Sequence, residues 1–161
     1  AHKIVEARGY KVPRMDGDLD PEGERQIHQH VMETSSHEFV FLTDYPKNIR
    51  PFYHMRHADN ENLTNSYDLI WKGTEITTGA QREHRIEVLE KQVLDKGLEL
   101  EGLNFYLDFF RYGAPSHGGF GMGLTRVVML LLDLPNIREA SFELRQACRI
   151  RRPGIGEGAY L

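Results

Sequence analysis

The order of apolar and polar positions along the 161-residue chain predicts several helices. Residues 2–8 have the character of a helix that ends at Gly9. Asp20, Pro21 and Glu22 combine a capping aspartate, a first-turn proline and an acid, so a helix should begin there and extend to about Thr34. A third helix is predicted over 81–96, where Ile86, Leu89 and Val93 form one apolar stripe before Gly97.

Other segments have the pattern of strands. Residues 39–42 predict a short buried strand, and 66–71 and 74–79 predict two strands joined by the two-residue turn Lys72-Gly73. The glycine-rich segment 118–123 predicts a further strand that leads into an apolar helix over 124–132. The connections are too short for parallel crossovers, so we expect an α+β fold with an antiparallel sheet flanked by helices.

A further helix is predicted over 103–112, and its aromatic residues are expected in the core. They are Phe105, Tyr106, Phe109 and Phe110.

Composition narrows the class of protein. The length fits one domain, and a net charge of −4 argues against a general nucleic-acid-coating surface. The single cysteine, Cys148, excludes an internal disulfide framework and a thiolate zinc cluster. The first residues resemble no targeting peptide and no apolar run is long enough to span a membrane, so we expect a soluble, cytoplasmic protein.

The predicted hairpin carries two carboxylates. In its regular register Ile70 pairs with Glu75 and Asp68 with Thr77, which puts Asp68 and Glu75 on one face as diagonal neighbours about 7–8 Å apart. Two such carboxylates can share a divalent cation that also binds phosphate oxygens. Alternatively, each carboxylate forms a structural pair with an arginine or lysine.

Two arginines each follow a segment of small residues or glycines. Arg82 comes after the small residues 77–80, where a ligand could approach the backbone, and its guanidinium suits a carboxylate. The alternative is a surface arginine at a helix start. Arg126 follows the glycine-rich segment 118–123, whose bare backbone could support a flat group; the alternative is a glycine bend used for close packing. The spacing does not match the dinucleotide fingerprint.

Two long blocks resemble a known family. Residues 66–82, SYDLIWKGTEITTGAQR, resemble the corresponding block of aspartyl-tRNA synthetases of the archaeal type, and residues 117–140 resemble motif 3 of class IIb synthetases. Residues 18–24 and 50–53 also resemble the archaeal-type enzymes at matching places. The resemblance extends to about residue 142 and implies the C-terminal part of a class II synthetase catalytic domain.

The resemblance implies roles for individual residues. Glu75 would bind ATP through Mg²⁺, Thr78 would lie near the metal and the amino acid, Asp68 would lie close to the same metal, and Arg82 would bind the aspartate side chain. The adenosine platform would consist of Gly121, Gly123, Leu124, Thr125 and Arg126. Glu75 and Arg126 would be the catalytic pair, and the implied reaction is ATP-dependent activation of L-aspartate followed by transfer to tRNA.

The chain departs from the family pattern at three places. Motifs 1 and 2 and the anticodon domain have no counterpart, Thr125 replaces a usual glutamate, and the segment from about 143 is atypical. We therefore expect a fragment that does not charge tRNA alone. It could be a fragment of an active ligase that is complete only with its other half, a truncated paralogue that binds nucleotide, aspartate or a protein without catalysis, or an inactive remnant. The expected partner chain is a second copy in a homodimer or a complementing chain.

Overall fold

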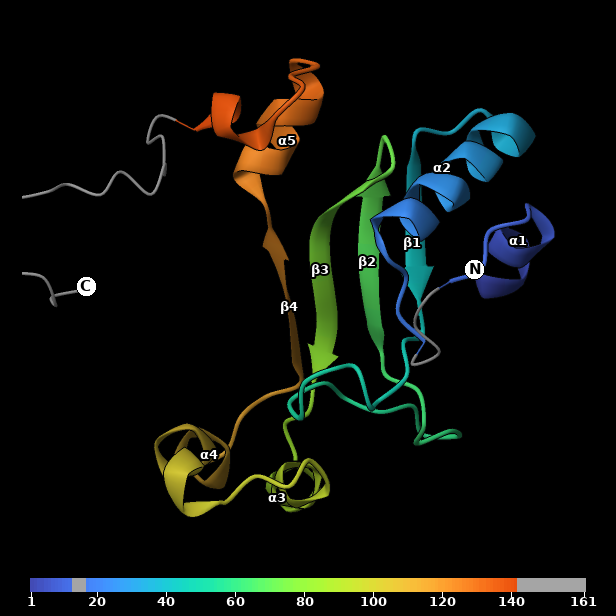
Figure 1. Cartoon of the computed structure of the whole chain (residues 1–161). Helices are drawn as coiled ribbons and strands as arrows, with labels where there is room; N and C mark the ends of the chain where they lie inside the picture. Colours follow the sequence, from blue (N-terminus) through green and yellow to red (C-terminus); the bar gives the residue numbers. More distant parts are fainter. Residues whose placement is uncertain (13–16, 142–161) are drawn as a thin grey trace, which may run out of the picture.

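The computed structural model describes residues 1–12 and 17–141 and contains a four-stranded antiparallel sheet in the order β1-β2-β3-β4 (Figure 1). The strands are β1 (Phe39–Thr43), β2 (Ser66–Trp71), β3 (Thr74–Arg82) and β4 (His117–Met122). The α+β prediction is confirmed. Cys148 and the atypical segment from about 143 lie outside the described residues.

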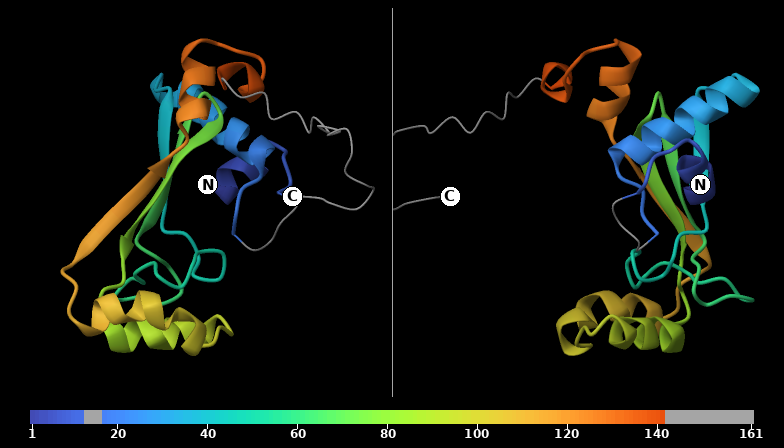
Figure 2. Two further views of the ribbon diagram at one scale, coloured as in Figure 1. Left: turned by 90° about the vertical axis from the view of Figure 1, so that its left-hand side faces the viewer. Right: turned by 45° about the vertical axis from the view of Figure 1, so that its right-hand side comes forward.

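The first two helices lie on one face of the sheet (Figure 2). They are α1 (His2–Ala7) and α2 (Pro21–Ser35), and α2 contacts β1, β2 and β3. The predicted start of α2 is confirmed: the Asp20 carboxylate accepts the Gly23 N–H at 3.0 Å. Val5, Val12, Leu19 and Ile27 form the core between these helices and β1.

The remaining helices lie at the two ends of the sheet (Figure 1). At one end α3 (Ile86–Asp95) packs on α4 (Asn104–Arg111), which follows the 3₁₀ turn η1 (Glu101–Leu103). At the other end are α5 (Leu124–Leu131) and η2 (Ile137–Ala140). The Lys72 ammonium at the tip of the β2–β3 hairpin fixes α5 by donating to the Leu130 carbonyl at 3.1 Å and to Asp133 at 2.6 Å.

The structure corrects the predicted burial of one strand and the predicted boundary between another strand and the helix that follows it. The strand at 39–43 is an edge strand, with Phe39 50% and Phe41 59% exposed, because it pairs on one side with β2. β3 continues to Arg82, so the helix predicted from 81 begins only at Ile86. Pairing with β4 as far as Arg82 keeps this segment extended.

The aromatic helix is only partly in the core. Phe110 is 7% exposed, but Phe105 and Phe109 are 73% and 71% exposed. These two rings are separated by four positions and therefore share a helix face that points away from α3.

We predict that Leu89→Ala destabilises the chain by about 2–5 kcal/mol, because this fully buried side chain joins α3 to α4 and its removal leaves a cavity. Urea denaturation followed by circular dichroism measures the loss. The control is Leu98→Ala, which removes a 44% exposed side chain and should change stability by less than about 0.5 kcal/mol. Equal losses for the two variants would contradict the packing described here.

Candidate functional site

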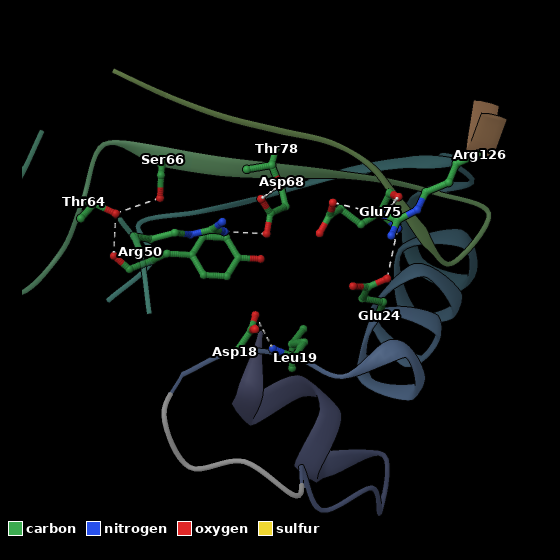
Figure 3. A network of polar contacts seen from close by, with 11 residues as sticks. Asp18, Leu19, Glu24, Arg50, Thr64, Ser66, Asp68, Glu75, Thr78 and Arg126 are labelled. Carbon is green, nitrogen blue, oxygen red and sulfur yellow. Dashed lines mark hydrogen bonds and ion pairs between the residues drawn. The ribbon is translucent and has the colours of Figure 1, made fainter. Parts of the chain in front are cut away.

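The polar side chains of the central strands point toward the side of the sheet where α2 lies (Figure 3). Asp68 of β2 stands opposite Thr78 of β3, and the Thr78 hydroxyl donates to Asp68 Oδ1 at 2.6 Å. The Arg50 guanidinium donates to Asp68 Oδ2, also at 2.6 Å. The arginine lies over the Tyr45 ring with 3.7 Å from Cζ to the centroid, so the ion pair is both buried and stacked.

An irregularity in the hairpin decides which residues share this face. The predicted pairs Trp71–Thr74 and Ile70–Glu75 are observed, but the register shifts between Leu69 and Ile70, so that Asp68 pairs with Thr78 and not with Thr77. Regular alternation would put Glu75 and Thr78 on opposite faces. The β-bulge instead brings both to the face of Asp68.

Arg126 joins the start of α5 to this face. Its Nη1 donates to the Glu75 carbonyl oxygen at 2.7 Å and to the Glu75 carboxylate at 3.2 Å. The two carboxylates that sequence reasoning singled out are therefore each paired with an arginine, Asp68 with Arg50 and Glu75 with Arg126. The pair with Arg126 is partly exposed to solvent, whereas the pair with Arg50 is buried.

Glu24 of α2 is a third carboxylate at the site, and the sequence analysis assigned it no role. It accepts the Glu75 N–H at 3.0 Å. Burial is the main cause that raises the pKa of Glu24 to about 7. The negative charges of Glu75 and Asp68 raise this pKa further. The Glu75 N–H and the charge of Arg126 act in the opposite direction and lower it. The sequence signals were its place in the first turn of a well-capped helix and in the segment 18–24, which resembles the archaeal-type enzymes.

We predict that the stability of the Glu24→Gln variant, measured as its free energy of unfolding relative to wild type, increases as the pH rises. Between the ordinary pKa of 4.5 and about 7, the folded wild type keeps a proton that the unfolded chain has released, so its stability falls through this window and levels off above it. E24Q keeps an acceptor for the Glu75 N–H but cannot ionise. Urea denaturation at about pH 5 and about pH 8 measures the difference.

The control for this pH effect is Glu87→Gln, which changes an exposed first-turn acid of α3. Its stability relative to wild type should be the same at both pH values. A constant difference between E24Q and wild type would contradict the raised pKa.

Arg82 ends β3 with part of its guanidinium unsatisfied. Its Cζ lies 4.9 Å above the Tyr53 ring, and Nη1 is buried without a hydrogen-bond partner among the described residues. Burial and then the charge of Arg82 lower the pKa of the neighbouring His54 to about 4, so this imidazole is neutral at pH 7. A buried donor without a partner is uncommon and suits an anionic ligand.

The glycine-rich strand β4 is exposed along its length, as its pattern of bare positions suggested. Gly121 stands opposite Thr78, and a Cβ added at Gly119 or Gly121 would meet no atom within 4 Å. Packing therefore does not require glycine at these two positions. They leave a flat backbone surface beside Thr78, which continues through Gly123 to Arg126.

The donor set fits a magnesium ion only together with a ligand. The described part of the chain holds no group of three His, Cys, Asp or Glu side chains placed to bind a metal. Mg²⁺ commonly uses one or two protein oxygens and completes its shell with water and phosphate oxygens. Glu75 and Thr78 offer such oxygens, and Arg126 donates to one of the two Glu75 carboxylate oxygens. Each oxygen of Asp68 accepts a hydrogen bond, one from Arg50 and one from Thr78.

Comparisons with known proteins identify the family of the chain. The family model described as tRNA synthetases class II (D, K and N) matches residues 4–142. The chain belongs to this family. The family and the class II fold expected from the two sequence blocks are thereby confirmed.

Named relatives come from the same family. The chain is 49% identical to an aspartate–tRNA(Asp/Asn) ligase of Aeropyrum pernix over 93% of this chain and 34% of that protein. It is similar to the aspartyl tRNA synthetase from Entamoeba histolytica, with 37% identity and a TM-score of 0.81 over 86% of this chain and 28% of that one.

Asparaginyl-tRNA synthetase from Pyrococcus horikoshii complexed with asparaginyl-adenylate is also similar, with 30% identity and a TM-score of 0.77 over 86% of this chain and 31% of that one. The chain thus spans about a third of the length of these relatives. No helix in the described residues is long and apolar enough to cross a membrane.

Proposed function

We propose that this synthetase chain provides the part of an aspartate–tRNA ligase site that binds ATP·Mg²⁺ and aspartate. Glu75 and Thr78 would hold the magnesium ion, with Asp68 beside them. Gly121, Gly123, Leu124, Thr125 and Arg126 would support the adenosine. Bound Mg²⁺ would neutralise charge on the phosphate oxygens, while the described residues orient the nucleotide.

The observation that carries this proposal is the placement of Glu75, Thr78 and the bare strand β4 around one face. The bulge in β3 aligns the first two, and Gly121 lies directly opposite Thr78. The Arg126 guanidinium, which now contacts Glu75, is close enough to turn toward a nucleotide bound on that surface. Such a site positions reactants and balances phosphate charge, as adenylate formation requires.

Aspartate is the proposed amino acid because, within the described part of the chain, Arg82 has an unsatisfied guanidinium N–H beside a neutral His54. A planar guanidinium can bind both oxygens of a side-chain carboxylate, which an asparagine amide cannot match. The activated aspartate would then pass to the terminal ribose of tRNA. That step is proposed for the whole ligase and not for this chain by itself.

Isothermal titration calorimetry of the purified chain tests the proposal. We expect wild type to bind ATP·Mg²⁺ and a non-hydrolysable aspartyl-adenylate analogue, and Glu75→Ala to weaken ATP·Mg²⁺ binding by at least about 30-fold. Glu61→Ala is the matched control, because it removes an acid that is 68% exposed and whose ion-pair partner is Lys91 of α3. Wild-type heats equal to buffer dilution for both ligands would refute the proposal.

Exposed apolar side chains on α4, β4 and α5 indicate a surface that another chain covers. The most exposed are Tyr112 at 91%, Phe105 and Leu124 at 73%, and Phe109 at 71%. We therefore predict concentration-dependent self-association of the purified chain, or binding to a complementing chain, measured by sedimentation velocity. Phe109→Glu should reduce the association. A monodisperse wild-type monomer that binds no complementing chain would contradict this prediction.

A further inference from the structure

Asp68 is surrounded by groups that donate hydrogen bonds. Arg50 Nη2 and Thr78 Oγ1 each lie 2.6 Å from one of its carboxylate oxygens. Burial and then the charge of Asp68 raise the pKa of the Tyr45 hydroxyl above its ordinary value. An ionised carboxylate only accepts and a guanidinium only donates, so the direction of these hydrogen bonds is fixed.

The hydrogen bond to Asp68 limits what the Thr78 hydroxyl can offer to a ligand. A hydroxyl has one proton and two lone pairs, and the Thr78 proton is committed to Asp68. Its lone pairs are then the only groups that it can offer to a ligand. Thr78 is partly exposed, and the facing residue on β4 is Gly121, which has no side chain to cover it.

We propose that Arg50 and Asp68 are a positioning pair that fixes the Thr78 hydroxyl as an acceptor for a cationic group of the ligand. This inference rests on the proposed function and deepens it. The cationic group is the magnesium ion of the nucleotide or the α-ammonium of the amino acid, since both are bound by oxygen lone pairs. Asp68 acts through Thr78: one of its oxygens accepts the hydroxyl proton of Thr78, and the other accepts a hydrogen bond from Arg50 (Figure 3).

Asp68→Asn tests the direction of the hydrogen bond between Thr78 and residue 68, because asparagine has nearly the same shape as aspartate. Because Arg50 can only donate, the amide oxygen must face Arg50 and the amide NH₂ must face Thr78. The hydrogen bond to Thr78 is thereby reversed, and one of its lone pairs is consumed. We expect D68N to weaken ATP·Mg²⁺ binding about 10- to 100-fold, as for a lost hydrogen bond to a charged group. Binding of AMP in EDTA, which needs no cation, should stay within about twofold.

Variants of Thr78 and Arg50 distinguish a loss of binding caused by the Thr78 hydroxyl from a loss caused by unfolding of the chain. D68N breaks a buried ion pair and could unfold the chain, so Thr78→Val provides a second route that leaves the pair intact. It should reproduce the selective loss of ATP·Mg²⁺ binding, and Thr78→Ser should restore wild-type binding. Arg50→Lys keeps the charge but not the planar guanidinium and should give an intermediate loss. A metal-free aspartyl-adenylate analogue distinguishes the two cationic groups: if it also weakens with Thr78→Val, the ammonium is the partner.

Nuclear magnetic resonance of the ligand-free, isotope-labelled chain tests the hydrogen bond without any ligand. We expect a slowly exchanging Thr78 hydroxyl proton that correlates with the Asp68 carboxyl carbon and disappears in T78V. Absence of this correlation in wild type would overturn the proposal, as would wild-type affinity of T78V for both ATP·Mg²⁺ and the metal-free aspartyl-adenylate analogue. If wild type binds none of the ligands, the proposed function and the acceptor role both fail, and the hydroxyl spectrum shows whether the hydrogen bond itself was correct.

Discussion

Asp68→Ala is expected to destabilise the folded chain by about 3–5 kcal/mol, because it breaks a buried ion pair. The side chains of Asp68 and Arg50 are only 8% and 12% exposed. Removing the carboxylate leaves the guanidinium buried without its counter-ion and the Thr78 hydroxyl without an acceptor. Urea denaturation followed by circular dichroism measures the change.

The chain offers a matched control for this substitution. Asp133 forms an ion pair of the same length, 2.6 Å, with Lys72, but its side chain is 79% exposed. Asp133→Ala should therefore cost less than about 1 kcal/mol. The double variant R50M/D68L should lose less stability than D68A, because no buried charge remains. Equal costs for D68A and D133A would show that burial does not determine the strength of the pair.

Arg82→Gln is expected to weaken binding of a non-hydrolysable aspartyl-adenylate analogue by at least about 30-fold, while leaving AMP binding unchanged. Among residues 1–12 and 17–141, the Nη1 donor of Arg82 is buried without a hydrogen-bond partner, and the ligand carboxylate would satisfy it. Arg82→Lys should give a smaller loss, since an ammonium keeps the charge but lacks the guanidinium fork. Calorimetry with the two ligands measures both variants.

The control for Arg82 is Arg25→Gln, which removes an arginine that is 58% exposed on α2. It should leave both affinities unchanged. An asparaginyl-adenylate analogue should bind wild type more weakly than the aspartyl analogue and lose less affinity in R82Q. If wild type instead bound the asparaginyl-adenylate analogue more tightly, the assignment of aspartate as the substrate would be wrong. The proposed nucleotide site would not be affected by that result.

The sequence by itself determined the helix start and the turn that depend only on residues adjacent in the chain. Asp20 and Pro21 specify the start of α2, because a side-chain acceptor and a residue without an N–H suit the first helical turn. Lys72 and Gly73 specify the hairpin, and both adopt the positive φ angles of 48° and 75° that a tight two-residue turn requires. The two long blocks were sufficient to identify the family.

Only the tertiary structure decided how the site is assembled. The bulge that brings Glu75 and Thr78 to one face arises from pairing between whole strands, and strict alternation along the sequence places them on opposite faces. Glu24 and Arg50 reach the same face from a helix and a loop that are distant in sequence, so no local spacing reveals them. Side-chain charges acquire their partners through burial and long-range contacts, and these exist only once the chain has folded.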